Sequence, residues 1–101
     1  MPRMNVTYTL HGIRFEWDSR KAASNLNDHG IAFETACEAF FDPFVFAVEG
    51  PVHPDERRDV IIGMTVNWRL MYVVYVLKAD VIRIVSARLA TKGERRQYED
   101  R

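Results

Sequence analysis

Residues 57–88, RRDVIIGMTVNWRLMYVVYVLKADVIRIVSAR, decide the fold of this chain. The segment contains three apolar runs rich in β-branched and aromatic residues, at 57–66, 69–77 and 81–88. The connections between these runs are only two or three residues long, which is enough to reverse the chain but not to cross over a sheet. The sequence therefore predicts an antiparallel meander of three strands.

Before this segment, three stretches are candidates for further strands. IRFEW at 13–17 alternates apolar and polar side chains, as a half-buried strand does. VTYTL, within residues 1–12, alternates in the same way, so that this region is expected to be either an N-terminal arm or an added strand. FVFAVEG at 44–50 is a third candidate, ended by a polar loop with two prolines.

Two helices are expected in the N-terminal half of the chain. Asp18 is a candidate N-cap of the first, over 19–29, and Gly30 stands at its C′ position. In this helix the spacing predicts that Ala22, Ala23 and Leu26 face the core.

The second helix, AFETACEAFF, has an apolar stripe and must end before Asp42, because Pro43 disfavours helical geometry in the residue that precedes it. Its start carries Ala32 where a capping Ser, Thr or Asp would stabilise it by about 1 kcal/mol. Near the C-terminus, Thr91 and Glu94 have the spacing of a capping box and open a third helix, KGERRQYED.

These elements predict a compact single domain of the α+β class over residues 1–101. An antiparallel sheet of about four to five strands is expected to carry two helices from the N-terminal half and one C-terminal helix. The chain is 48% apolar, and no apolar run approaches the roughly 18–20 residues that span a bilayer. With one cysteine, Cys37, and no export signal at the start, a reducing, cytoplasmic location is the expectation.

The net charge of zero argues against a general nucleic-acid-binding protein, but the charges are unevenly distributed. Residues 83–101 hold six Lys or Arg against three acids, whereas residues 42–56 hold four acids and no Lys or Arg. In the last strand, Arg83 and Arg88 differ in parity, so they cannot share a face of the sheet unless a bulge intervenes. This uneven distribution of charge favours an anionic partner for a basic face of the protein.

Among groups able to move protons, His29 lies at a helix C-terminus, with Lys21 two turns earlier on roughly the same side. His29 is equally suited to be a C-terminal capping group. Arg95 and Tyr98 are three residues apart and therefore adjacent on one helix face. The histidine spacings match no metal motif, so no metal or other cofactor is expected.

Further residues are placed to edge a groove in the sheet. Arg57, Arg58 and Arg69 stand where strands start, and Trp68 beside Arg69 is able to stack on a base or to fold back onto the sheet.

Several of these residues fall in pieces that together are quite specific: W-D-x-x-K-A-x-x-N from Trp17, H-G-I-x-F from His29, and R-I-V-S-A-R-x-A from Arg83, followed by E-R-x-x-Y. Over about 13–99 the chain resembles the BrnT-type toxins of bacterial type II toxin–antitoxin modules. Residues 1–12 extend beyond the usual start of that family. The matching positions are Trp17, Asp18, Lys21, Asn25, His29, Arg57, Arg83, Ser86, Arg88, Glu94, Arg95 and Tyr98.

The resemblance implies a RelE-like fold and a ribonuclease that blocks translation by cleaving RNA. It also implies a cognate BrnA-type antitoxin, ribbon-helix-helix-like, which dimerises, neutralises the toxin in a heterotetramer and binds operator DNA. No membrane partner is implied. On this basis the hypothesis is metal-independent cleavage through the ribose 2′-hydroxyl. The catalytic candidates are His29, Lys21, Arg88 and Tyr98, and the RNA-binding candidates are Arg57, Arg69, Arg83, Arg95 and Trp68.

Two alternatives remain open at this point. The chain is also compatible with a non-catalytic α+β module that binds an acidic or DNA-binding partner protein. It is further compatible with a toxin that cleaves only messages held on the ribosome.

Overall fold

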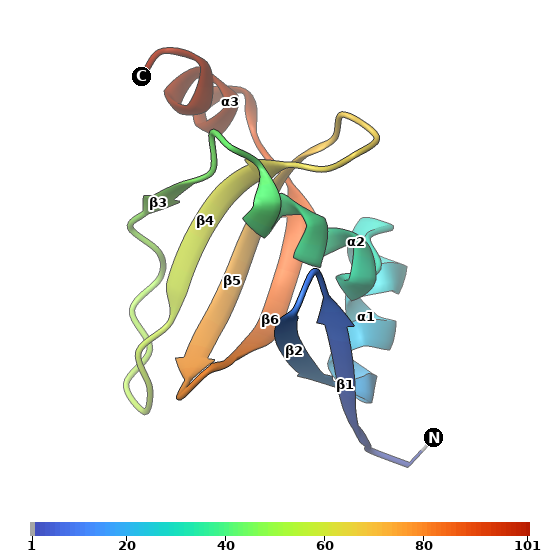
Figure 1. Ribbon diagram of the computed structural model, residues 1–101. Coiled ribbons are helices and arrows are strands. Elements are labelled where there is room, and N and C mark those ends of the chain that lie inside the picture. The colour runs from blue at the N-terminus through green and yellow to red at the C-terminus, as the bar shows by residue number, and fades with distance from the viewer. Residues whose placement is uncertain (1) are drawn as a thin grey trace.

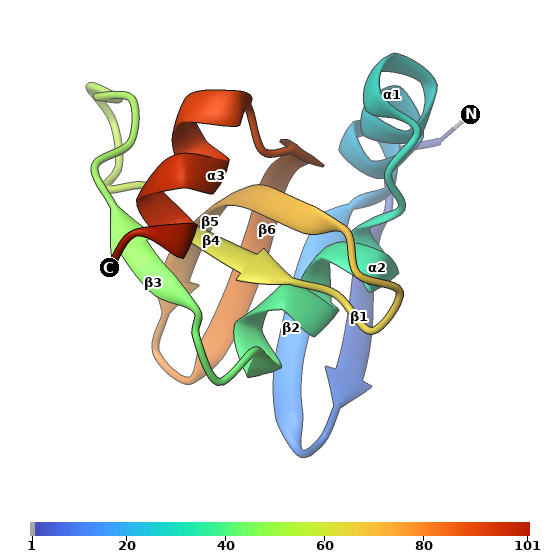
Figure 2. The same cartoon turned by 90° about the horizontal axis from the view of Figure 1, so that it is seen from above.

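The computed structural model describes residues 2–101 as one six-stranded sheet with helices on both of its faces (Figures 1 and 2). The strand order is β1-β2-β6-β5-β4-β3. All neighbours are antiparallel except β2 and β6, which are parallel. The elements are β1 (Asn5–Leu10), β2 (Ile13–Asp18), α1 (Ser19–His29), α2 (Phe33–Glu38), the 3-10 turn η1 (Ala39–Phe41), β3 (Phe46–Val48), β4 (Asp59–Met64), β5 (Leu70–Lys78), β6 (Val81–Leu89) and α3 (Lys92–Glu99).

The α+β class and the β4-β5-β6 meander are confirmed. The sheet has more strands than the four to five expected, because both β1 and the short β3 join it. β1 forms a hairpin with β2, closed by His11 and Gly12, which have φ angles of 50° and 81°. This pair of positive φ angles makes a tight turn whose twist matches that of the strands.

The main core lies between the sheet and the layer formed by α2 and η1. Phe15 and Trp17 from β2 pack with Phe33, and Met71 and Val73 from β5 complete the fully buried cluster. Gly63 in β4 permits this packing, since a Cβ at that position would meet the backbone of Ala39 in η1. The two layers therefore approach each other closely at this point.

The other face of the sheet buries Val60, Ile62 and Leu70. α3 lies across one end of this face (Figure 2), and its Tyr98 ring packs 6.2 Å from the ring of Phe46, measured between centroids. α3 itself has no buried residue, so it is held by polar contacts more than by apolar burial. None of the helices among residues 2–101 has the length and apolar character needed to cross a membrane.

The predicted helix caps are present. Asp18 accepts hydrogen bonds from the N–H groups of Arg20 and Lys21, and Gly30 adopts the left-handed conformation at φ 70°. Thr91 and Glu94 form the complete capping box. Ala32 makes no side-chain capping bond, as expected.

The predicted inward face of α1 is wrong in part. Leu26 is 53% exposed and Ala23 is also exposed, whereas Asn25 is the buried residue of this helix. α1 lies beside β6 rather than flat on the apolar core, so its contact face centres on a polar group that can bond to a strand edge.

Candidate active site between α1 and β6

A β-bulge in β6 changes which side chains share a face. The register with β5 runs Val74↔Ser86 and then Tyr75↔Ile84, which leaves Val85 as the extra residue. An extra residue reverses the alternation beyond it. Arg83 and Arg88 therefore lie on the same face, together with Ser86, which is the outcome that the sequence allowed only if a bulge intervened.

Asn25 attaches α1 to the second half of β6. β2 pairs with β6 only as far as Arg83, so the strand edge beyond that point needs another partner. The Asn25 carboxamide supplies it: Oδ1 accepts from the Ala87 N–H at 3.0 Å, and Nδ2 donates to the Ala87 carbonyl at 2.8 Å. The same amide nitrogen donates to the Ile31 carbonyl at 3.0 Å, which fixes the chain after the helix.

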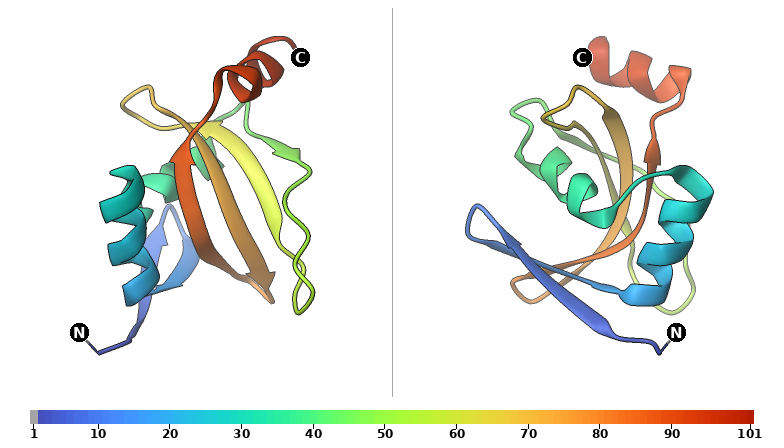
Figure 3. Two further views of the ribbon diagram at one scale, coloured as in Figure 1. Left: turned by 180° about the vertical axis from the view of Figure 1, so that it is seen from behind. Right: turned by 90° about the vertical axis from the view of Figure 1, so that its right-hand side faces the viewer.

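A cavity of about 340 Å³ opens between α1 and β6. These two elements lie side by side in the fold (Figure 3). Two catalytic candidates, Lys21 and His29, line it, and both side chains are solvent-exposed. Ser86 and the bulged Val85 form its wall on the β6 side. The remaining lining residues are Arg20, Ser24, Asn25 and Asp28. The cavity thus places two proton-transfer groups beside the strand that carries Arg83 and Arg88.

Arg88 is held by contacts on two sides of its guanidinium group. Nη1 and Nη2 donate to the two carboxylate oxygens of Glu94 at 2.8 and 3.0 Å, and Nη1 also donates to the Leu89 carbonyl at 3.2 Å. The guanidinium carbon lies 3.9 Å from the centroid of the Tyr72 ring. The hydrogen bonds to Glu94 raise the pKa of Arg88, and those from Arg88 lower the pKa of Glu94. Both groups are therefore charged at neutral pH.

Arg83 is also paired. It contacts Glu16 at 3.1 Å and donates to the Asn5 side-chain oxygen at 2.7 Å, and it is 25% exposed. Tyr72, whose ring lies against the guanidinium group of Arg88, was not predicted from the sequence. Of the two arginines predicted to stand before β4, Arg58 is 22% exposed and pairs with Glu56, whereas Arg57 is 88% exposed and pairs with Asp59.

Tyr98 lies in a different environment from Lys21 and His29. Its hydroxyl donates to Asp42 at 2.6 Å. Burial and this hydrogen bond raise the pKa of Tyr98 to about 12, so the phenol is protonated at neutral pH. Burial alone raises the pKa of Asp42, but bonds from Tyr98 and from the N–H groups of Phe44 and Met64 outweigh it, and the net pKa is lowered.

None of the RNA-binding candidates lines the α1–β6 cavity itself, and neither does Arg88. Arg95 lies on α3 with Glu99 at 4.0 Å, and the Arg69 N–H donates to Thr65 Oγ1 at 3.2 Å. Trp68 is 82% exposed, with φ 62°, in the β4–β5 turn.

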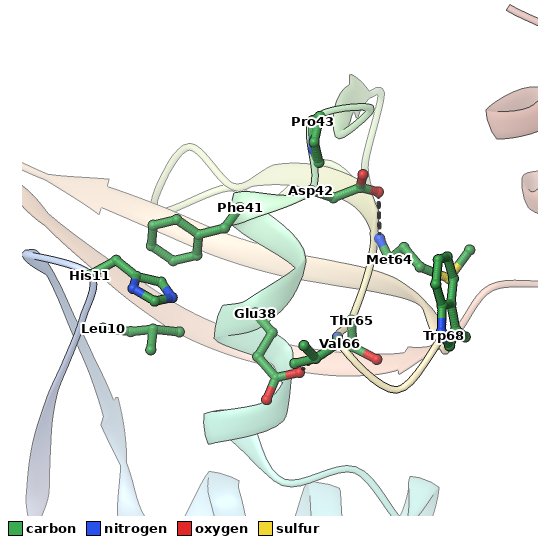
Figure 4. Close-up of a pocket in the computed structure, with 10 residues that line it drawn as sticks. All are labelled: Leu10, His11, Glu38, Phe41, Asp42, Pro43, Met64, Thr65, Val66 and Trp68. Carbon is green, nitrogen blue, oxygen red and sulfur yellow. Dashed lines mark hydrogen bonds between the residues drawn. The ribbon is translucent and has the colours of Figure 1, made fainter.

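Trp68 edges a second cavity of about 430 Å³ (Figure 4). Phe41, Val66 and Met64 give this cavity an apolar lining, and its two carboxylates, Glu38 and Asp42, both accept hydrogen bonds from the backbone of the β4–β5 region. The lining is completed by Leu10, His11, Pro43 and Thr65. An apolar cavity with acidic groups is suited to a protein side chain more than to phosphate.

Residues 2–101 contain no group of three or more His, Cys, Asp and Glu side chains placed to hold a metal ion. The chain does offer Lys and Arg side chains as the cationic groups of the α1–β6 region.

Comparisons with known proteins agree with this architecture. A family model described as "Ribonuclease toxin, BrnT, of type II toxin-antitoxin system" matches residues 17–94. The fold is similar to the crystal structure of the Brucella abortus ribonuclease toxin BrnT, with a TM-score of 0.50 and 22% identity, covering 75% of this chain and 94% of that chain. No curated protein matches the sequence.

Proposed function

The chain belongs to the BrnT family of ribonuclease toxins of type II toxin–antitoxin systems, and on this premise we propose that it cleaves RNA at the α1–β6 cavity. One observation carries the assignment: Lys21 and His29 line a single cavity beside the strand whose bulge turns Arg83 and Arg88 to one face. Proton-transfer groups and guanidinium groups are the parts that phosphodiester cleavage needs when no metal takes part.

The proposed reaction is attack of a ribose 2′-hydroxyl on the adjacent phosphorus. The 2′-oxygen–phosphorus bond forms, the bond from phosphorus to the 5′-oxygen breaks, and the products are a 2′,3′-cyclic phosphate and a 5′-hydroxyl. His29 or Lys21 takes the proton from the 2′-hydroxyl, and the other group, or water, returns one to the leaving oxygen. The side chains of His29 and Lys21 are both exposed and can reach a bound RNA strand.

Arg88 is assigned to stabilise the negative charge that builds on the pentacoordinate phosphate. Three of its five N–H groups are accounted for by Glu94 and the Leu89 carbonyl. Two N–H groups are left for phosphate oxygens, and the Glu94 pair and the Tyr72 ring hold the guanidinium plane in place. Arg83, with part of its side chain exposed on the same face, is assigned to bind a neighbouring phosphate.

Tyr98 is assigned a supporting part in this scheme. Its hydroxyl proton is directed at Asp42, and its pKa of about 12 makes it a poor base at neutral pH. We therefore expect Tyr98 to hold α3, and with it Glu94, in position.

The test is incubation of the purified chain with a 5′-labelled RNA, followed by analysis of the product ends. Fragments ending in a 2′,3′-cyclic or 3′-phosphate support the proposal, and fragments ending in a 3′-hydroxyl contradict the 2′-hydroxyl route. If only RNA that is being translated is cleaved, the substrate is the message bound to the ribosome.

We further propose that RNA cleavage inhibits translation and that a BrnA-type, ribbon-helix-helix-like antitoxin neutralises it. The complex is expected to be a heterotetramer that binds operator DNA through the antitoxin, in the cytoplasm. Membership of a type II toxin family supports an antitoxin partner. Induced expression should arrest growth at once, and co-expression of the neighbouring antitoxin gene should restore it.

The apolar cavity beside Trp68 is the proposed binding site for the antitoxin. Exposed apolar patches commonly mark protein–protein contacts, and Trp68 with Val66 exposes such a patch at the cavity. The variant Trp68→Ala distinguishes this from the RNA-stacking role predicted for Trp68. Weaker antitoxin binding with unchanged RNA cleavage favours the protein contact, and the reverse result favours stacking.

A second candidate function is that of a non-catalytic module that binds a partner protein. The ion pairs of Arg83 with Glu16 and of Arg88 with Glu94 favour it, because both arginines are already engaged in structural roles. Under this alternative the purified chain binds its partner but leaves free and translated RNA intact.

A further inference from the structure

β1 (Asn5–Leu10) forms one edge of the sheet and pairs only with β2. It lies at the outside of the fold, away from α3 (Figures 1 and 3). Its side chains alternate, with Val6 and Tyr8 half-buried against the core and Thr7 and Thr9 exposed. The strand is thus well anchored on its inner side.

The hydrogen-bonding phase of the hairpin determines which backbone groups point outward. The Ser19 N–H donates to the Met4 carbonyl at 2.8 Å, so Met4 faces β2. In an antiparallel ladder alternate residues bond to the same neighbour. Residues of even number therefore bond to β2, and the N–H and C=O groups of Asn5, Thr7 and Thr9 point away from the sheet.

This edge lacks the usual protection against strand pairing. Proteins commonly guard an edge with Lys, Pro, a bulge or a very short strand. The sequence NVTYTL has no charge and no proline, and it pairs with β2 in an unbroken register over six residues. The opposite edge is better protected, since β3 has only three residues.

We propose that β1 is a homodimer contact, in which two copies of the chain pair their β1 strands antiparallel about a two-fold axis at Thr7. In this register Thr7 faces Thr7 of the second copy, and Asn5 faces Thr9. All three outward-pointing residues are then in hydrogen-bonded positions, which gives about six main-chain hydrogen bonds. The two sheets become one continuous sheet.

The side chains are complementary in this register. On the inner face Val6 of one copy lies opposite Tyr8 of the other, which is a favourable pairing of a β-branched and an aromatic residue. On the outer face Thr7 meets Thr7, and no charge opposes a like charge. A strand that is complementary to itself in this register is suited to pair with a second copy, because a two-fold interface uses the same surface on both subunits.

This inference does not rest on the proposed function. Residues 5–10 lie outside the matched range 17–94, and neither Lys21 nor His29 is on β1. The contact is therefore assigned to this chain rather than to its family.

Cysteine cross-linking tests the register. In the proposed dimer the Thr7 Cα atoms lie about 5.5 Å apart, within the range that a disulfide bridges. The two Thr9 Cα atoms are separated by roughly 14 Å, which is too far. Thr7→Cys should give a covalent dimer on mild oxidation, and Thr9→Cys, equally exposed, should not. The native Cys37 is fully buried and does not interfere.

Sedimentation velocity of the full chain, over a roughly hundredfold concentration range, tests the dimer itself. Thr7→Lys places two like charges at the axis and should raise the dimer dissociation constant at least about tenfold. Val52→Lys, at a side chain 97% exposed in the β3–β4 loop, is the matched control and should leave it unchanged. The proposal is overturned if the chain stays monomeric or if both cysteine variants cross-link equally. It is also overturned if the backbone amides of β1 become protected from hydrogen exchange only when the antitoxin binds.

Discussion

Replacing Asn25 with alanine should destabilise the protein more than its position in a polar helix suggests. Asn25 is 6% exposed and makes three hydrogen bonds, two to the Ala87 backbone and one to the Ile31 carbonyl. Alanine removes all three hydrogen bonds. The N–H and C=O groups of Ala87 are then left without a partner on this side, because β2 pairs with β6 only as far as Arg83. α1 would then lose its main polar attachment to β6.

The magnitude follows from the number of bonds. At a net value of about 1 kcal/mol each, three bonds give a loss of about 3 kcal/mol in the free energy of unfolding. The adjoining cavity admits water to some of the exposed groups, which keeps the loss near this value rather than above it. With a urea m-value of about 2 kcal/mol/M, the unfolding midpoint should fall by roughly 1.5 M.

Urea unfolding of Asn27→Ala is the matched control. Asn27 is on the same helix, but it is exposed and bonds only to Asp28 at 3.4 Å, so its replacement should change stability by less than about 0.5 kcal/mol. Asn25→Asp refines the test, because its new carboxylate oxygen would face the Ala87 and Ile31 carbonyls. The folded-state pKa of that carboxyl is then raised, and the variant should be relatively more stable at low pH than at pH 7. Equal losses for Asn25→Ala and Asn27→Ala would refute the reasoning.

Three further predictions concern packing, pH and metal. Gly63→Ala should lower the free energy of unfolding by about 2–3 kcal/mol because the new methyl group meets the Ala39 backbone, whereas Gly93→Ala, where a Cβ has room, should be neutral or slightly stabilising in the same thermal melt. Because the folded-state pKa of Asp42 lies below its ordinary value of 3.8, stability present above that pH should be lost as the pH falls below it, and Asp42→Asn should flatten this acid limb in a pH series of urea titrations. RNA cleavage should proceed at an unchanged rate in excess EDTA, and its loss on chelation, with recovery on adding Mg²⁺, would contradict the proposed chemistry.

The elements that local chemistry determines could be predicted from the sequence. Asp18, Gly30 and the Thr91–Glu94 pair each act within a few residues of their own position, and each has its predicted role. The meander was predictable for the same reason, since its short connections allow no other arrangement.

Features that depend on distant contacts could not be predicted. The bulge at Val85 arises from the pairing of β6 with β5, and no single-strand pattern marks it. That bulge decides that Arg83 and Arg88 share a face. Likewise, Leu26 fits a helical apolar stripe, yet Asn25 is buried because β6 presents an unpaired backbone edge at Ala87. The pairing of Tyr98 with Asp42 spans 56 positions and gives no local signal.

The central claim is that Lys21 and His29, which line the α1–β6 cavity, act on one phosphodiester together with Arg88 from the neighbouring strand β6. The most direct test compares the RNA cleavage rates of purified alanine variants at these positions with that of Arg96→Ala, which removes an exposed charge from α3. Arg88→Lys accompanies Arg88→Ala, because lysine keeps the charge but cannot form the two-pronged contact. The account predicts losses of about 100-fold or more for Arg88→Ala and for at least one of Lys21→Ala and His29→Ala, with Arg96→Ala within about threefold of the wild type. Folded Lys21, His29 and Arg88 variants that all cleave RNA at the wild-type rate would contradict it.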